Sequence, residues 1–288
     1  MKRSAKRLWI PVVMVIVGLI FTGIGMTSLI TGVVNTTFKP EIVDTNFQTE
    51  TFQLNALDSN FTIKTNNINN VWITFDDSKP YGGEATGDLS EFKVTESSNT
   101  TTIQTARDIC AITFTGCFKS NFDHITLNLP ESYTGSITVN GLVQNVSVHS
   151  QSLTTLRSLD INTLNTHVEI QNIDAKTELN AMNLDVSLFN VSGRTEVNSI
   201  NSKNEVSEFQ RPLFMDVNGM NSTVTIADPT GELGYHVSFE SLATSFSDKQ
   251  AGIERDRFFS SGQPIIKNTS NNLLTLELDG LNQSVVVR

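Results

Sequence analysis

The stretch from Leu159 to Asp228 repeats one pattern of apolar and polar positions four times. Each copy has an aliphatic residue, Asn, a small residue, an aliphatic residue, Asn, two variable positions, then Val, a polar residue and an aliphatic residue. The four copies begin at Ile161, Leu179, Val197 and Val217. Their starts are therefore about twenty residues apart, and such a period over several copies is typical of a solenoid, in which each copy forms one rung.

Within a copy, apolar and polar positions alternate at period two, which predicts two short strands joined at a corner. The residues expected to point inward in the first two copies are Ile161, Leu164, Val168 and Ile170, with Leu179, Met182, Val186 and Leu188 as their counterparts. Burying four aliphatic side chains contributes roughly 6 to 12 kcal/mol, whereas ordering about twenty residues costs roughly 30 kcal/mol. The copies must therefore stack in order to fold. In the third copy Asn204 fills the Val position, which predicts an irregular rung: either the amide finds hydrogen bonds or the strand shifts to turn it outward.

Stacking at about 4.8 Å places equivalent Asn residues above one another in two ladders. The first Asn ladder comprises Asn162, Asn180, Asn198 and Asn218, and the second comprises Asn165, Asn183, Asn201 and Asn221. Stacked amides can hydrogen-bond from rung to rung, so we interpret both ladders as structural. The alternative is a row of amides that binds a ligand.

The same frame recurs at 139–148, at 278–287 and, near the start, at 54–63. The interval from Leu54 to Val139 leaves space for four steps of the period, and the interval from Val217 to Leu278 for three. We therefore expect an all-β fold, a β-solenoid with rungs of about 18–22 residues, over 54–288. The last rung has no later sequence to cover its edge, so the apolar segment Phe239–Phe259 is expected to fold back over it.

The N-terminal region has the pattern of a membrane anchor. Residues 1–7 carry four basic and no acidic residues, and 8–34 carry no charge. As a helix, the segment from Trp9 to Val34 spans about 39 Å, enough to cross a hydrocarbon core of about 30 Å. The pattern predicts a cytoplasmic basic tail (1–7), one transmembrane helix (8–34), a juxtamembrane linker with the first strand (35–53) and an extracytoplasmic domain (54–288). A cleaved signal peptide is the alternative.

The predicted outer domain is strongly acidic. Residues 40–288 hold all 30 acidic residues and, after subtraction of Lys2, Arg3, Lys6, Arg7 and Lys39, 15 of the 20 basic ones. The formal charge is therefore near −15. Such a field repels nucleic acid and other anionic polymers, so no nucleic-acid partner is expected.

Candidate chemistry in the sequence is sparse. Cys110 and Cys117, the two cysteines, are compatible with a disulfide that closes a loop outside the membrane, with free thiols, or with a redox role. Two cysteines cannot make a zinc site, and His124, the nearest histidine, stands alone in the sequence. The other histidines fall on separate predicted strands, and no rung shows three carboxylates stacked on one face. We therefore expect no metal, no cofactor and no enzymatic activity.

The run from Ile125 to Pro130, followed by Gly135, Ile137, Val139 and Asn140-Gly141, resembles the putative-adhesin family of bacterial envelope proteins, a domain of unknown function. The resemblance covers about residues 50–288. It implies a membrane-tethered β-solenoid at a bacterial surface, in a family without established catalytic residues. The chain departs from that pattern by using Asn-small-aliphatic-Asn where Asn-Gly is usual.

Together these features predict a single-pass protein of the cell envelope, with its C-terminal domain outside, that serves as a structural or adhesin-like binding module. Its partners are expected to be the membrane and an envelope or surface ligand. One alternative is a scaffold that polymerises by end-to-end stacking, which requires a homo-oligomer. The other is a β-helix enzyme that acts on polysaccharide.

Overall fold

The computed structural model describes residues 47–54, 60–105, 122–261, 264–269 and 271–288, which belong to one compact unit, Thr45–Arg288. The predicted transmembrane segment 8–34, Cys110 and Cys117 lie outside the described residues. In the described part, no helix has both the length and the apolar character needed to cross a bilayer.

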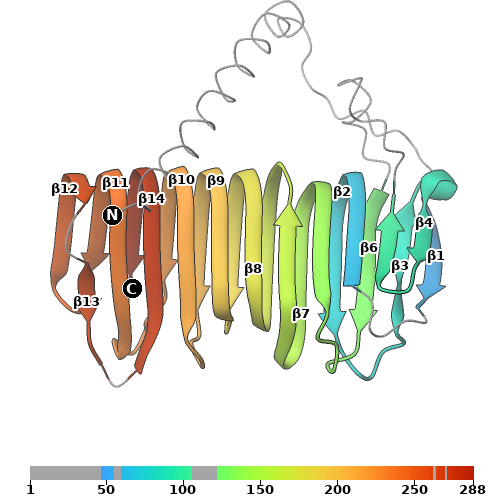
Figure 1. Ribbon diagram of the computed structural model, residues 1–288, viewed down its shortest axis with the longest axis horizontal. Coiled ribbons are helices and arrows are strands. Elements are labelled where there is room, and N and C mark those ends of the chain that lie inside the picture. The colour runs from blue at the N-terminus through green and yellow to red at the C-terminus, as the bar shows by residue number, and fades with distance from the viewer. Residues whose placement is uncertain (1–46, 55–59, 106–121, 262–263, 270) are drawn as a thin grey trace, which may run out of the picture. The chain divides into compact units, whose positions relative to one another are not determined.

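The described residues are all-β, as expected, apart from one short 3₁₀ helix at Leu89–Glu91. The strands are β1 (Gln48–Gln53), β2 (Asn60–Phe75), β3 (Gly82–Gly87), β4 (Lys93–Glu96), β5 (Thr100–Gln104), β6 (Phe122–Leu129), β7 (Ser136–Asn162), β8 (Asn165–Phe189), β9 (Ser192–Ser207), β10 (Leu213–Ile226), β11 (Leu233–Asp248), β12 (Ile253–Ser261), β13 (Ile265–Lys267) and β14 (Asn271–Val287). They pair in the order β1-β3-β6-β2-β7-β8-β9-β10-β14-β11-β12, and Figure 1 shows the central ones side by side.

The four sequence copies pair in parallel and in register. Ile161 lies beside Leu179, Leu179 beside Val197, and Val197 beside Val217. This register brings identical positions of every copy next to each other, so each apolar position forms a continuous buried stripe. Val168, Val186 and Val224 are each 0% exposed. The repeat period therefore sets the register of the sheet.

The corner of each copy corrects part of the predicted inward set. Met182, expected inside, is 46% exposed, and Leu164 is only half-buried. Ala181, the small residue before Met182, lies on the inner side of the corner, so the side chain of Met182 turns outward. Alternation then resumes after the second Asn, and Leu184 is buried instead.

The third copy is not irregular, contrary to expectation. Asn204 stays in register between Val186 and Val224 and is fully buried. Its Nδ2 donates to Ser202 Oγ at 3.1 Å and to the Thr223 carbonyl oxygen at 3.3 Å. The Oδ1 atom has no partner among the described residues.

The intervals between distant copies do not place extra rungs between those copies. Val217 pairs directly with Leu278, because β11 lies on the far side of β14 rather than between β10 and β14. At the other end Ile63, and not Leu54, pairs with Val139. The residues between β2 and β7 form β3 to β6, of which β5 and β6 pair with β2. Both intervals therefore fold outside the central strands.

The edge of β14 is covered, as predicted for the segment Phe239–Phe259. β11 pairs with β14 over its full length, and β12 pairs antiparallel with β11. A buried cluster of charged side chains stabilises the packing of β11 and β13: Lys267 Nζ lies 3.3 Å from Asp228 Oδ2 and 3.8 Å from Asp248 Oδ2. The Tyr235 hydroxyl donates to Asp248 Oδ2 at 2.7 Å. These ion pairs therefore connect the segment before β11, the end of β11 and the end of β13.

Candidate functional site

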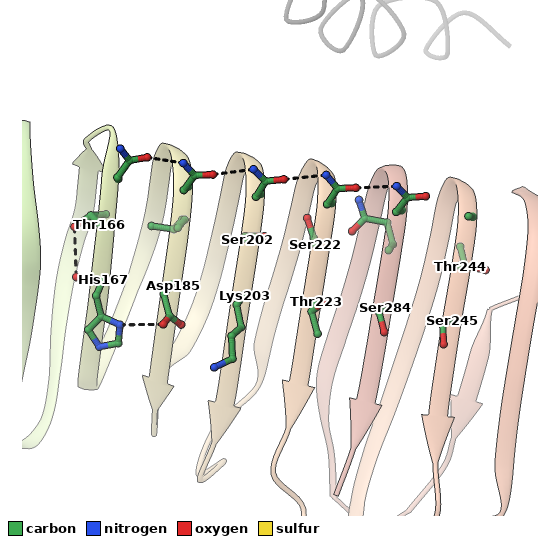
Figure 2. A pocket seen from close by; sticks show the side chains of 18 of the residues that line it. Thr166, His167, Asp185, Ser202, Lys203, Ser222, Thr223, Thr244, Ser245 and Ser284 are labelled. Carbon is green, nitrogen blue, oxygen red and sulfur yellow. Dashed lines mark hydrogen bonds and ion pairs between the residues drawn. The ribbon is translucent and has the colours of Figure 1, made fainter. Parts of the chain in front are cut away.

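The second Asn ladder is a continuous chain of amide hydrogen bonds on the outer surface. Each Nδ2 donates to the Oδ1 of the preceding copy at 2.6 to 2.8 Å, along Asn165, Asn183, Asn201, Asn221 and Asn282. Asn282 extends the predicted set by one copy, because β14 lies directly beside β10. The amides are exposed and held in one orientation, and Figure 2 shows this chain as the dashed line along its upper part.

The first Asn ladder has the same connectivity, but its amides are less available to a ligand. Amide hydrogen bonds of 2.7 to 3.1 Å join Asn140, Asn162, Asn180, Asn198 and Asn218. Here Asn180 Nδ2 also donates to Glu178 Oε1, at 3.0 Å, and Asn198 Nδ2 to Glu196 Oε1, at 3.3 Å. These part-buried amides use both N–H groups within the protein.

A groove with a volume of about 1070 Å³ runs along the second Asn ladder. Three consecutive residues of each neighbouring copy line it, for example Asn201, Ser202 and Lys203. The groove crosses the strands, so each copy contributes one step of its length. Figure 2 shows the labelled outer side chains in a row below the ladder, namely His167, Asp185, Lys203, Thr223, Ser284 and Ser245.

Buried polar atoms lie at the base of this groove. Ser222 is 3% and Gln283 is 2% exposed, yet both belong to its lining. Gln283 Nε2 donates to the Gly219 carbonyl oxygen at 3.0 Å, whereas Gln283 Oε1 and Ser222 Oγ have no partner among the described residues. A buried polar atom without a partner costs about 1 to 3 kcal/mol. Both atoms are themselves inaccessible to solvent, so a ligand in the groove reaches them only if the side chains move.

The charges in the groove are mixed and partly compensated. His167 Nδ1 lies 3.6 Å from Asp185 Oδ2 in the next copy, and Lys203 follows one copy further along. Asp256 of β12 also lines the groove. With one lysine and two carboxylates, the lining has no strong preference for an anion or a cation.

Carboxylates do stack on one face, which corrects the expectation from the sequence. Register places them in one row, the acidic row, on adjacent strands: Asp160, Glu178, Glu196, Asp216 and Glu277. Like charges on neighbouring strands repel, and Arg194 Nη2, 3.5 Å from Asp216 Oδ2, offsets part of this repulsion. Burial raises the pKa of the Asp160 carboxyl, while the hydrogen bond from Ser158 opposes that rise.

His124 is not isolated in the fold. Its Nδ1 lies 3.1 Å from Asp123 Oδ2, its Nε2 lies 3.6 Å from Glu84 Oε1, and its ring lies 5.0 Å from that of Trp72. The hydrogen bond with His124 lowers the pKa of the Asp123 carboxyl. Within the described ranges, no group of three or more His, Cys, Asp or Glu side chains is arranged to hold a metal ion.

Sequence reasoning missed two rows of side chains that run from copy to copy. Asp160, Glu178 and Glu196 each directly precede the first residue of a copy, so they recur with the period of the copies. The aliphatic residue between the two Asn residues of each copy, expected in the interior, lies on the outer side of the corner. Alignment of the positions that flank each copy, and not only of the Asn pair, would have revealed the row of carboxylates. The row of outward aliphatic residues could not be found in this way, because it depends on how the backbone turns at the corner.

Comparisons with known proteins give low similarities. No family model and no curated protein matches the chain. Among solved structures, a putative adhesin from Bacteroides fragilis is 12% identical, with a TM-score of 0.40 and coverage of 83% of this chain and 96% of its own. A putative cell adhesion protein from Clostridium sporogenes is 12% identical, with a TM-score of 0.35 and coverages of 84% and 98%. A putative adhesin from Parabacteroides distasonis is 11% identical, with a TM-score of 0.38 and coverages of 84% and 98%. Similarities of this size identify neither a family nor a ligand for the chain.

Proposed function

We propose that the chain is a membrane-anchored, extracytoplasmic β-solenoid that binds a surface ligand, as an adhesin-like module of a bacterial cell envelope. The observation that carries this proposal is the groove of about 1070 Å³ along the exposed second Asn ladder. Its amides are already oriented by their neighbours, so a ligand need not order them on binding.

A groove-filling substitution tests the binding function. Thr223→Trp places a large ring in the groove without removing an Asn of the ladder. The matched control is Thr51→Trp, at an exposed position of β1, at the other end of the strand order. The full-length chain, reconstituted in lipid nanodiscs, is cosedimented with isolated bacterial cell walls. We expect Thr223→Trp to weaken binding at least about tenfold, a change of about 1.4 kcal/mol, and Thr51→Trp to bind normally. Equal binding by both variants would refute the role of the groove.

The anchor and the orientation are part of the same proposal, and they rest on the charge-free segment 8–34 and the basic residues before it. Protease added to intact cells that express the full chain should digest the domain after residue 39 and leave a small membrane-bound fragment. A mature chain whose N-terminus begins beyond Val34 would instead show a cleaved signal peptide.

End-to-end polymerisation has less support in the described residues. β1 and β12 lie at the two ends of the strand order, and β12 carries the exposed Glu254, Arg255 and Asp256. Charged side chains on an edge strand oppose pairing with another chain. We therefore propose that the chain binds its ligand without assembling into filaments.

The acidic row favours an enzyme acting on polysaccharide as the second candidate function. Glycoside hydrolysis requires two neighbouring carboxyl groups, one of them with a raised pKa. Asp160 has a raised pKa and lies beside Glu178 in the register. If this pair is catalytic, the full-length chain should release reducing sugar from a neutral polysaccharide, and Asp160→Asn should abolish the release. Absence of release by the unmodified chain would remove this candidate.

A further inference from the structure

We propose that the groove and the second Asn ladder bind a linear, uncharged glycan, with one sugar unit beside each repeat copy. This inference rests on the proposed binding function and adds the chemical class of the ligand. Four features of the described residues carry it: the spacing of the copies, the chemistry of the ladder, the row of exposed aliphatic side chains beside it, and the distribution of charge.

The spacing favours a glycan over a peptide. Neighbouring copies are about 4.8 Å apart, the distance between paired strands, and a pyranose unit in an extended glycan has about the same length. An extended peptide advances about 3.3 Å per residue, so its side chains would fall out of step with the ladder. Because the groove crosses paired strands, their backbone groups are already hydrogen-bonded and cannot pair with an added peptide strand.

The amides offer one donor and one acceptor per copy. In the interior of the ladder, Asn183 and Asn201 each use one N–H and one lone pair of the Oδ1 atom within the ladder. An Asn side chain has two N–H donors and two lone pairs, so one of each remains for a ligand. A sugar hydroxyl both donates and accepts, and therefore matches this pair. The chain of amides polarises its members in one direction, which strengthens each further hydrogen bond.

Exposed aliphatic side chains, here called the aliphatic row, run directly beside the ladder. Met182, Met220, Leu281 and Leu242 are 46%, 38%, 39% and 37% exposed. The first three each precede an Asn of the ladder, and register aligns Leu242 with Leu281. Ile200, the equivalent residue of the third copy, is half-buried. Exposed apolar side chains that lie near one another mark an interaction site more often than single ones do. The row flanks the groove and is not part of its lining, so a sugar ring lying over the ladder places its C–H-rich face against the row while its hydroxyls reach the amides.

The charges exclude an acidic ligand. The acidic row lies beyond the first Asn ladder on the same strands, and residues 40–288 carry a formal charge near −15. This field repels glycans that carry carboxylate or phosphate groups. The lining holds mainly amides and hydroxyls with a single lysine, Lys203, whereas anion binding requires several lysines or arginines. With one lysine and two carboxylates, the lining does not select a cation either, so the ligand that fits the groove is uncharged.

Binding of labelled oligosaccharides to the full-length chain in nanodiscs tests the inference. The probes are β-1,4-linked glucose and N-acetylglucosamine chains of two to eight units, with hexagalacturonate and a glucosamine hexamer as charged controls. We expect affinity for at least one neutral series to rise with each added unit and to level off near five or six units. This limit follows from the five amides of the ladder. Tighter binding of either charged hexamer, or affinity independent of length, would overturn the proposal.

Matched Asn substitutions locate the site. Asn183→Ala and Asn201→Ala should each lower the affinity for the neutral hexamer about fivefold, by loss of hydrogen bonds to the ligand. Asn180→Ala, in the first Asn ladder, should leave it unchanged. If an Asn variant does not fold, Met220→Ser replaces it, with Phe189→Ser, another exposed apolar side chain, as its control. Equal losses in both ladders would overturn the assignment. Cell-wall binding that Thr223→Trp abolishes, without binding of any neutral glycan, would reject the glycan but keep the proposed function.

Discussion

At the scale of single residues, the inside of a copy follows its alternating pattern except where the corner interrupts it. Val168 and Val186 are buried as the pattern predicts, whereas Leu164 and Met182 are not. A period of two describes a straight strand, and it cannot specify where the backbone turns or which residue takes the inner side. Two consecutive outward residues at the corner, such as Met182 and Asn183, therefore could not be inferred from alternation alone.

Asn204 gives a stability prediction at this scale. Asn204→Val replaces a buried amide whose Oδ1 lacks a described partner with the residue that most other copies use. We expect the free energy of unfolding to rise by about 1 kcal/mol, measured by urea denaturation. Val186→Ala, at the equivalent position, should lower it by about 2 kcal/mol through lost burial and a cavity. A loss of several kcal/mol in Asn204→Val would show that its two hydrogen bonds are essential.

Tyr235 gives a pH prediction. Burial, the hydrogen bond to Asp248 and the nearby carboxylates raise the pKa of its phenol above the ordinary range. Above about pH 10 the unfolded chain releases this proton while the folded chain retains it. Stability should therefore fall by up to about 1.4 kcal/mol per pH unit for each such tyrosine. Thermal unfolding of Tyr235→Phe should show a shallower decline above pH 10. Burial also raises the pKa of Tyr133, so this tyrosine contributes to the decline that remains. An unchanged slope would contradict this explanation.

At the scale of elements, the sequence could predict which copies pair when they follow each other, but not what happens across long intervals. When two copies follow each other at one period, the connection between them is too short for any pairing other than that of neighbours. The interval between Val217 and Leu278 is about three periods long. Within it, β11 does not pair with β10; β14 pairs with β10 instead, and β11 pairs with the other side of β14. The choice depends on contacts between distant segments, such as Lys267 with Asp228 and Asp248, that no local pattern records.

Gly280 tests the close approach between β14 and β10. Its φ is +152°, and a Cβ there would collide with the carbonyl oxygen of Gly219. We expect Gly280→Ala to destabilise the chain by about 3 kcal/mol, from backbone strain and overpacking. Gly252 has a φ of +68° but nothing within 4 Å of its added Cβ, so Gly252→Ala should cost only about 1 kcal/mol. Equal costs in denaturant unfolding would show that β14 and β10 are not packed as described.

The charges on β12 test how the end of the sheet avoids association. Glu254→Val with Arg255→Val leaves the net charge unchanged but gives the edge strand two apolar, β-branched residues. We expect this double variant to associate, with a rise in mass by light scattering. Lys203→Val with Glu205→Val makes the same change on β9, which pairs on both sides, and should stay unassociated. Association of both variants to the same extent would attribute the effect to surface hydrophobicity alone.

At the scale of the whole molecule, the chain combines a charge-free N-terminal segment with an acidic all-β unit, and a groove crosses the repeat copies of that unit. The sequence predicted the all-β class and placed equivalent Asn residues in two sets. It did not distinguish the two sets, because their availability depends on neighbours: Glu178 and Glu196 occupy the amides of the first ladder. Nor could it predict the groove, which requires the outward turn at the corner and the position of β14.

The most direct test of the central claim is an NMR titration that observes the Asn side-chain amides. The full-length chain, labelled with ¹⁵N at Asn and held in nanodiscs, is titrated with the neutral hexasaccharide that binds best, with assignment by single Asn→Gln substitutions. We predict that the Nδ2 resonances of Asn183, Asn201 and Asn221 shift, while those of Asn180 and Asn198 stay unchanged. Unshifted amides in the second ladder at a saturating hexasaccharide concentration, or equal shifts in both ladders, would contradict the account.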